Sequence, residues 1–191
     1  MKKIKSLVLL VSFMMAVSVL SVSSASAEEM PAKLKAIADK AVSAAGDCAQ
    51  KLNGAWGDQH AALVASGQKG AFADFKSMQT ALNGLLAGSG ANAIYVMYPS
   101  GAIDKDPFYI TVDGSAEPDD YGTEYKWEMG FAASWTGITT AADKVSKDEN
   151  GNLILSVYAP VRDTKDNIVA ILGLDYPAPE AAEFPNWIEK D

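Results

Sequence analysis

The sequence predicts an α+β domain, in which helices come first and an antiparallel sheet of about five strands follows. From Pro31 to about Ser66, apolar residues recur at spacings of three and four while lysines occupy the other face, which indicates a long amphipathic helix. From Ala93 onward, apolar residues gather in short runs separated by turn residues, which indicates strands joined by hairpins. Residues 28–191 are therefore expected to form a single domain with a hydrophobic core.

The helical part contains its own break and stop signals. Glycines weaken the first helix, and Asn53-Gly54 is the expected site of a kink. A second helix is expected from Phe72 to Leu86, where Gly88-Ser89-Gly90 ends it. The buried stripe of the first helix is expected to consist of Leu34, Ile37, Ala38, Ala41, Ala45, Cys48, Leu52 and Trp56.

The sheet part is divided by turn signals. Asn150-Gly151 is typical of a tight turn, and Asp166-Asn167 is expected to form another. The tail, 179–191, is expected to be a surface segment with little structure of its own. The expected elements are strands 93–98 and 108–112, an acidic loop 115–123, a short helix 127–134, a weaker strand 138–144, and strands 153–159 and 168–175.

The first 27 residues have the three zones of a secretory signal peptide. Three lysines near the start precede an apolar run from Leu7 to Leu20, and the segment closes with Ala25-Ser26-Ala27, which fits a signal peptidase site. The run is shorter than the roughly 20 residues that a helix needs to cross a bilayer. We therefore expect cleavage before Glu28 and a periplasmic or secreted protein, with an uncleaved membrane anchor as the alternative.

The charge of the remaining chain is strongly negative. Without the three lysines of the signal segment, it has 13 basic and 24 acidic residues, a net charge of −11, and Arg162 is its only arginine. No basic stripe is present to neutralise phosphates, so the composition argues against nucleic acid and anionic membrane surfaces as partners.

Residues for common catalytic chemistry are scarce. The sequence has one histidine, His60, and one cysteine, Cys48, so a histidine-rich zinc site, a thiolate zinc site and an internal disulfide are excluded. We expect no catalytic residues, no metal and no cofactor. His60 is expected on a helix surface, and the alternative is that it ligates a noncovalent haem. Cys48 is expected to be a small buried side chain, and the alternative is a free thiol for an intermolecular bridge.

One stretch of the chain is rich in carboxylates, and it allows two interpretations. Paired acids there could serve a glycosidase or bind calcium, which would make the chain an exported hydrolase or a calcium binder. The favoured interpretation is a solvated loop in an acidic protein. The residues concerned are Asp104, Asp106, Asp113, Glu117, Asp119 and Asp120.

The residues from Glu117 to Ala178 resemble a known family. The segments that carry the resemblance are Glu117-Pro118, Gly122-Thr123-Glu124-Tyr125, the strand and turn from Leu155 to Asp163, and the strand from Ile168 to Asp175. In this order they are similar to the later half of the extracytoplasmic PAS-like sensor domains called Cache or PDC domains, found in chemoreceptors, histidine kinases and diguanylate cyclases. The resemblance implies a PAS-like sheet over 91–178 with the long helix packed against it.

The resemblance also implies a function and a site. It implies a small-molecule-binding sensor domain, with an organic or amino-acid-like ligand held between the sheet and residues 115–140. No membrane helix or output module follows within the sequence, so we expect a free-standing domain that acts through a separate membrane receptor or carries its ligand. The expected ligand-binding residues are Asp175, Tyr125, Trp127, Tyr158, Tyr109, Asp113 and Trp135.

The two closing strands support this interpretation independently of the family. Alternation places Ser156 and Tyr158 on one face of their strand, and Gly173 leaves room where another group approaches. Asp175 ends an apolar strand, where a buried carboxylate requires a donor or a ligand cation. The segment from Tyr125 to Met129 lacks the arginine with which amino-acid-binding members hold a carboxylate. The alternative function is a structural protein without a ligand that forms a homodimer through its N-terminal helix.

Overall fold

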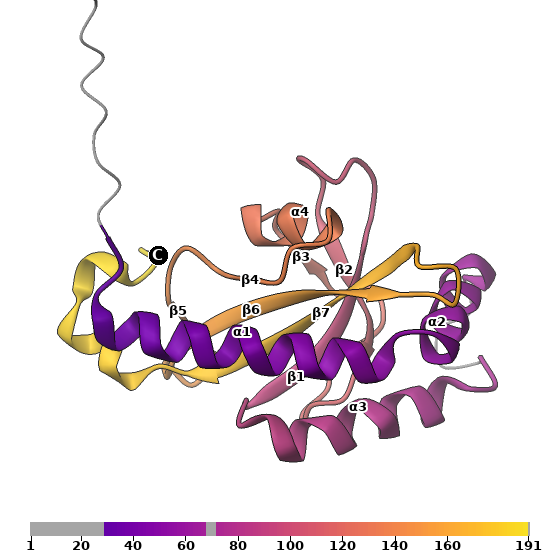
Figure 1. Ribbon diagram of the computed structural model, residues 1–191, viewed down its shortest axis with the longest axis horizontal. Coiled ribbons are helices and arrows are strands. Elements are labelled where there is room, and N and C mark those ends of the chain that lie inside the picture. Colours follow the sequence, from indigo (N-terminus) through magenta and orange to yellow (C-terminus); the bar gives the residue numbers. More distant parts are fainter. Residues whose placement is uncertain (1–28, 68–71, 191) are drawn as a thin grey trace, which may run out of the picture.

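A computed structural model describes residues 29–67 and 72–190 of the chain, so the expected signal peptide and its cleavage site lie outside the described residues. One curved antiparallel sheet forms the centre, with three helices on one face and a short helix on the other (Figure 1). The α+β class, with the N-terminal helix packed on the sheet, is confirmed. In the described part of the chain, no helix combines the length and the hydropathy needed to cross a membrane.

The first face of the sheet carries α1 (Ala32–Leu52), α2 (Ala55–Ser66) and α3 (Phe75–Ser89). The helix expected over 31–66 is therefore two helices, and the break falls at Asn53-Gly54 as expected, because Gly54 has a φ of 86°. The second expected helix begins three residues later than predicted, at Phe75, and continues through Gly88 to Ser89. Gly90 then ends it in the left-handed conformation.

The sheet has seven strands rather than about five. The two extra strands, β3 and β5, have two residues each, and the weaker strand expected over 138–144 shrinks to two residues in β4. The order across the sheet is β3-β2-β1-β7-β6-β4, with β5 also paired to β6. The strands are β1 (Ala93–Pro99), β2 (Phe108–Asp113), β3 (Glu124–Tyr125), β4 (Thr140–Ala141), β5 (Ser146–Lys147), β6 (Leu153–Arg162) and β7 (Ile168–Pro177).

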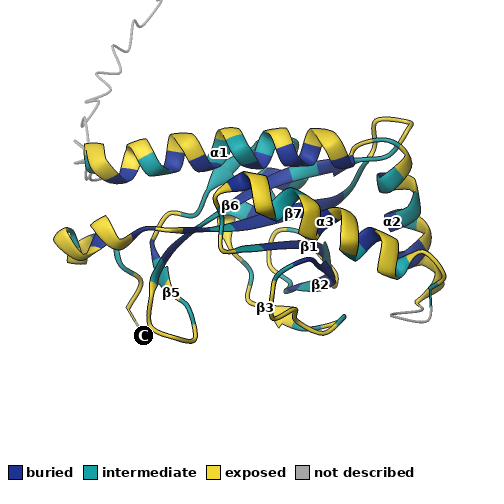
Figure 2. Ribbon diagram, turned by 90° about the horizontal axis from the view of Figure 1, so that it is seen from below, coloured by how far each residue is buried: buried dark blue, intermediate teal, exposed yellow. Residues whose placement is uncertain are grey.

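The main core lies between the helices and the sheet. The buried stripe of α1 packs on β6 and β7, where Val157 and Leu172 are fully buried, and Cys48 is buried there as expected. Exposed residues follow the outer side of α1 (Figure 2). The apolar stripe of α1 is thus buried against the sheet. A homodimer through this helix stays a prediction, and it would have to use the polar face of α1.

A bulge at Thr111 in β2 makes room for α2. Along β1, Val96 pairs with Val112 and Met97 with Ile110, so Thr111 is the extra residue. Its hydroxyl donates to the Val96 carbonyl at 2.9 Å and lies 2.8 Å from His60 Nε2. His60 is therefore completely buried, and the expected surface position was wrong, because sequence pattern could not reveal a polar partner inside the core.

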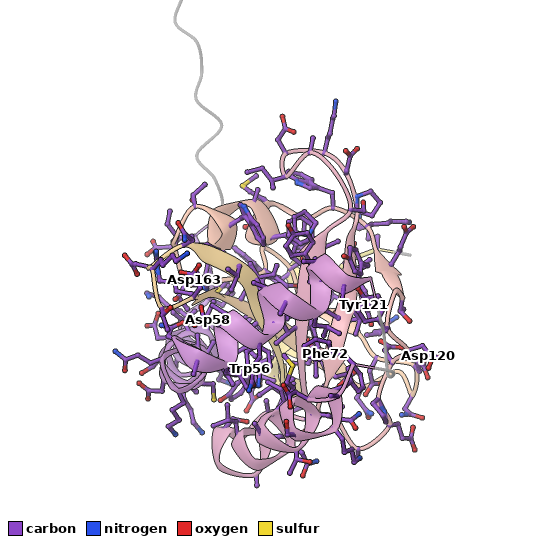
Figure 3. The ribbon with its side chains drawn as sticks, turned by 90° about the vertical axis from the view of Figure 1, so that its right-hand side faces the viewer. Trp56, Asp58, Phe72, Asp120, Tyr121 and Asp163 are labelled. Atoms are coloured by element: carbon purple, nitrogen blue, oxygen red, sulfur yellow. The ribbon has the colours of Figure 1, made fainter. Side chains whose placement is uncertain are left out.

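The end of the molecule with α2 is tied to the turn between β6 and β7. Asp58 of α2 accepts hydrogen bonds from the backbone N–H and the hydroxyl of Thr164, and Figure 3 shows it beside Asp163 of that turn. Asp163 in turn accepts bonds from the backbone N–H groups of Lys165 and Asn167. The expected turn at Asp166-Asn167 is present, and Asp166 adopts the left-handed conformation in it, with a φ of 66°.

The tail has more structure than expected. Two short 3₁₀ helices, η1 (Pro179–Glu183) and η2 (Pro185–Trp187), follow β7 and lie beside the start of α1 (Figure 1). Lys33 and Glu183 form an ion pair at 2.7 Å between α1 and η1. The apolar side chains of the tail join those of α1 in a separate small cluster, which sequence periodicity could not indicate because 3₁₀ turns are so short.

Candidate functional site

The second face of the sheet carries the candidate site. It is covered by α4 (Met129–Trp135) and by the chain that leads into it, where Phe131 packs against the sheet. Ser156 on β6 and Asp175 on β7 are direct partners across the two strands, and Tyr158 on β6 is the partner of Gly173. Alternation therefore brings these side chains to one face, as the sequence predicts for Ser156 and Tyr158.

Asp175 is held by two hydroxyl groups. Its Oδ1 accepts a hydrogen bond from Tyr95 at 3.0 Å and another from Ser156 at 2.7 Å. Its Oδ2 makes no hydrogen bond to any residue in the described part of the chain. Burial raises the pKa of this carboxyl above its usual value, although both hydroxyls oppose the shift. The site therefore holds a carboxylate with one oxygen fixed by two hydroxyls and the other without a hydrogen bond from the described residues.

Tyr95 reaches Asp175 because Gly173 has no side chain. A Cβ at Gly173 would collide with the Tyr95 ring, so the close approach that the sequence predicts at this glycine is that of the ring. The outer face of the ring stacks on Tyr125, with 6.2 Å between centroids. Tyr125 is fixed by its hydroxyl, which donates to Asp119 at 2.7 Å.

Tyr158 and Glu128 form the second polar pair of the site. The hydroxyl of Tyr158 donates to Glu128 Oε2 at 3.0 Å. Gly130, at the start of α4, leaves space for the same ring, since a Cβ there would lie 2.6 Å from Tyr158 Cδ2. Burial raises the pKa of the Glu128 carboxyl, the Tyr158 bond opposes the shift, and the charges of Glu189, Asp175 and Asp143 add to it.

A small cavity lies beside these pairs. Its volume is about 150 Å³, which leaves room for a few water molecules or a small ligand. Three carboxylates and one ammonium group line it, so its local charge is negative. The lining residues are Glu128, Met129, Gly130, Ala142, Asp143, Lys144, Ser146, Ser156 and Glu189.

None of the seven expected site residues lines the cavity itself. Asp175 lies just behind Ser156, Tyr158 holds Glu128, and Tyr125 covers Tyr95. Asp113 lies nearby but organises the acidic loop, since its carboxylate accepts the backbone N–H groups of Ser115 and Asp119. Within the described residues, no group of three or more potential metal ligands comes together, and the acidic stretch forms no such group.

Three of the expected aromatic residues lie away from the cavity. The Trp127 indole N–H donates to the Ile103 carbonyl at 2.9 Å, which ties the entry of α4 to the loop before β2. Trp135 packs edge-on against Tyr98 and Phe108. The Tyr109 ring contacts Tyr98 and Tyr121 and does not reach Asp175. Trp127 and Trp135 therefore pack on the second face of the sheet, and none of these three aromatic residues lines the cavity.

Sequence reasoning missed Tyr95, Ser156 and Glu128 as site residues. Ser156 had a detectable signal, because it is a polar residue on the same strand face as Tyr158. Tyr95 is distant from Asp175 in sequence, and only the pairing of β1 with β7 brings the two together. Glu128 follows Trp127 directly, and nothing in its local pattern distinguishes it from the other acids of the segment.

Comparison with known proteins gives a distant likeness in structure. No protein-family model matches the chain, and no curated protein matches it either. A solved structure of a methyl-accepting chemotaxis protein X is similar at a TM-score of 0.39 and 16% identity, over 82% of this chain and 64% of that one. The periplasmic sensory domain of the Campylobacter jejuni chemoreceptor Tlp1 is similar at a TM-score of 0.36 and 11% identity, over 83% of this chain and 68% of that one. The chain thus spans less than two thirds of the first of these structures, and likeness of this degree carries no functional argument.

Proposed function

We propose that this chain is an exported sensor domain that binds a small organic cation in the cavity beside Asp175. Its role is binding and not catalysis, and it acts through a separate membrane receptor or as a carrier of its ligand. The sequence resemblance to Cache domains supports the sensor role, and the pattern of residues 1–27 supports export to the periplasm or secretion.

The observation that carries the proposal is the arrangement of Asp175. A partly buried carboxylate costs free energy unless it is paired, and the two hydroxyls satisfy only one of its oxygens. The adjoining cavity is small and partly open, and polar side chains from four segments of the chain converge on it. A bound ammonium group would pair with the remaining oxygen and offset the desolvation of Asp175.

The charge of the cavity determines the class of ligand. Glu128, Asp143 and Glu189 line it, and Asp175 adds a fourth carboxylate behind Ser156. The only cation in the lining, Lys144, is already bonded to the Asn186 carbonyl. An anionic ligand would be repelled, whereas an amine, or an amino acid that presents its ammonium group inward, would be attracted.

A thermal-shift screen of amines, amino acids, organic acids and nucleobases tests the proposal. Binding to the folded state alone at a concentration of 100 Kd stabilises by about 2.7 kcal/mol, which raises Tm by roughly 5–10 °C in a chain of this size. We expect amines and amino acids to give such shifts and organic acids to give none. Asp175→Asn should abolish the shift, because the amide has no charge for the ammonium group.

The matched control is Asp39→Asn, which removes the same charge on the exposed side of α1. It should leave the shift unchanged. A shift that survives in Asp175→Asn would remove Asp175 from the site. No shift with any compound, in a protein that proves to be a tight dimer, would favour the structural alternative instead. Sequencing of the mature N-terminus tests export directly, with a start at Glu28 as the expected result.

A further inference from the structure

The segment at 184–190, called here the latch, forms one wall of the cavity. It follows β7 and the turn η1, and it ends beside the chain that enters β5. Glu189 lines the cavity from the latch, while Lys144 and Ser146 line it from the opposite strand. Because Asp175 lies near the end of β7, its carboxylate and the latch belong to one continuous stretch of chain.

The latch is docked by contacts to residues 144 and 145 and by the packing of Phe184, Trp187 and Ile188 on the small apolar cluster beside α1. The Val145 N–H donates to the Trp187 carbonyl at 2.9 Å, and the Glu189 N–H donates to the Val145 carbonyl at 2.8 Å. The Lys144 ammonium donates to the Asn186 carbonyl and lies 5.2 Å from the centroid of the Trp187 ring. These contacts hold the wall of the cavity in place.

The docking is local and therefore easy to reverse. Apart from the half-buried Phe184, Trp187 and Ile188, the latch residues are exposed, and its secondary structure is one 3₁₀ turn and one isolated bridge. Segments with few buried contacts and exposed backbone hydrogen bonds open at a small fraction of the global free energy of unfolding. The latch can thus leave its place while the sheet and the helices remain folded.

Docking and charge in the cavity are linked. The docked latch brings Glu189 towards Glu128 and Asp143, and this like charge contributes to the raised pKa of Glu128. A cation in the cavity would remove the repulsion and attract Glu189. By thermodynamic reciprocity, a ligand that favours the docked latch binds more tightly when the latch is docked.

We propose that the latch reports whether the cavity is occupied: a bound organic cation holds 184–190 docked on residues 144–145, and an empty cavity lets this segment open. The inference rests on the proposed function and adds its regulation. The docked and open states of the domain would differ most at the surface formed by the latch and residues 143–146. A partner protein that distinguishes the two states would bind there.

Trp187→Ala tests the coupling without changing a cavity residue or a charge. We expect amide hydrogen exchange at Val145 and Glu189 to become about tenfold faster, because the variant loses the aromatic packing that docks the latch. The pKa of Glu128, followed by NMR of its carboxyl carbon, should fall towards its ordinary value as Glu189 leaves and water enters. The matched control is Phe72→Ala, a half-buried aromatic residue at the far end of the molecule (Figure 3), which should change neither quantity.

The second arm adds n-butylammonium chloride to the wild-type chain, with binding measured by calorimetry. Binding should slow exchange at Val145 and Glu189 at least threefold and leave the Asp163 amide of the distant turn unchanged. If the probe binds but amide exchange in the latch does not slow, the latch proposal is wrong. It is also wrong if Trp187→Ala speeds exchange but leaves the pKa of Glu128 unchanged. No binding of the probe would count against the proposed function instead, and the Glu128 titration would still decide whether the latch and the cavity are coupled.

Discussion

Protonation of His60 should destabilise the fold as the pH falls. The hydroxyl of Thr111 uses its only proton to donate to the Val96 carbonyl, so the neutral ring of His60 donates from Nε2 to Thr111. A second proton would have to enter at Nδ1, which is buried without a hydrogen-bond partner in the described part of the chain. The stacked Trp56 ring covers the same side chain at 5.7 Å. Burial lowers the pKa of His60 from 6.5 to about 4, although the backbone of Val169 lies close enough to oppose part of the shift.

The magnitude follows from this shift in pKa. The folded pKa lies below the unfolded one, so the stabilisation is fully present above pH 6.5 and is lost as the pH falls towards 4. Each unit of pKa difference corresponds to about 1.4 kcal/mol, which gives a total loss of about 3 kcal/mol and a loss of about 2 kcal/mol by pH 5. The raised pKa values of Asp175 and Glu128 have the opposite effect on stability as the pH falls. Burial favours the protonated form of these two carboxyls, so their protonation stabilises the folded state.

The assay is urea unfolding followed by circular dichroism at pH 7.5 and pH 5, for the wild-type chain and His60→Gln. Glutamine can donate to Thr111 but does not titrate, so the variant should lose about 2 kcal/mol less between the two pH values than the wild type does. The other ionisable groups contribute equally to both proteins and cancel in the comparison. Parallel pH dependences of the two proteins would refute the reasoning and place a proton acceptor near Nδ1.

Two further predictions concern glycines at close approaches. Gly173→Ala should lower the free energy of unfolding, measured with urea, by about 1–3 kcal/mol, because the new Cβ displaces the Tyr95 ring. It should also weaken cation binding, because the displaced Tyr95 hydroxyl no longer orients Asp175. Unchanged binding would show that Tyr95 does not orient the carboxylate. Gly57→Ala should lower the free energy of unfolding by a similar amount, because the added Cβ collides with the Arg162 carbonyl that accepts the Gly54 N–H. Its ligand affinity in calorimetry should be unchanged, since α2 lies on the other face of the sheet.

Much of the fold was predictable from local pattern. The spacing of Leu34, Ala41 and Cys48 predicts a helix with one buried stripe, and the structure buries that stripe on the sheet. Glycine at 54 predicts the break between α1 and α2, because its backbone can adopt a positive φ. The short strands β3 and β5 were not predictable, since two residues carry no periodicity and form only where a longer neighbour offers its edge.

The candidate site was predictable only in part. Asp175 stands out in sequence as a carboxylate in an apolar strand, and Tyr158 follows from alternation along β6. Tyr109 looked equivalent to the other aromatic residues, but the bulge at Thr111 and the pairing of Tyr109 with Tyr98 turn it to other contacts. The residue types suggested an aromatic pocket, but no aromatic residue lines the cavity, because strand register and the packing of the tail place other residues there.

Composition and local pattern were enough to establish the class of the fold, the negative charge, the scarcity of histidine and cysteine, and the carboxylate at position 175. These properties depend on residue content and on contacts between near neighbours in the chain. Folding alone shows that Tyr95 and Ser156 hold Asp175, that His60 is buried on a bulge, and that Glu189 lines the cavity. Each of these contacts joins residues that are far apart in sequence. Strand register and the packing of the tail bring them together, and neither leaves a periodic signal in the sequence.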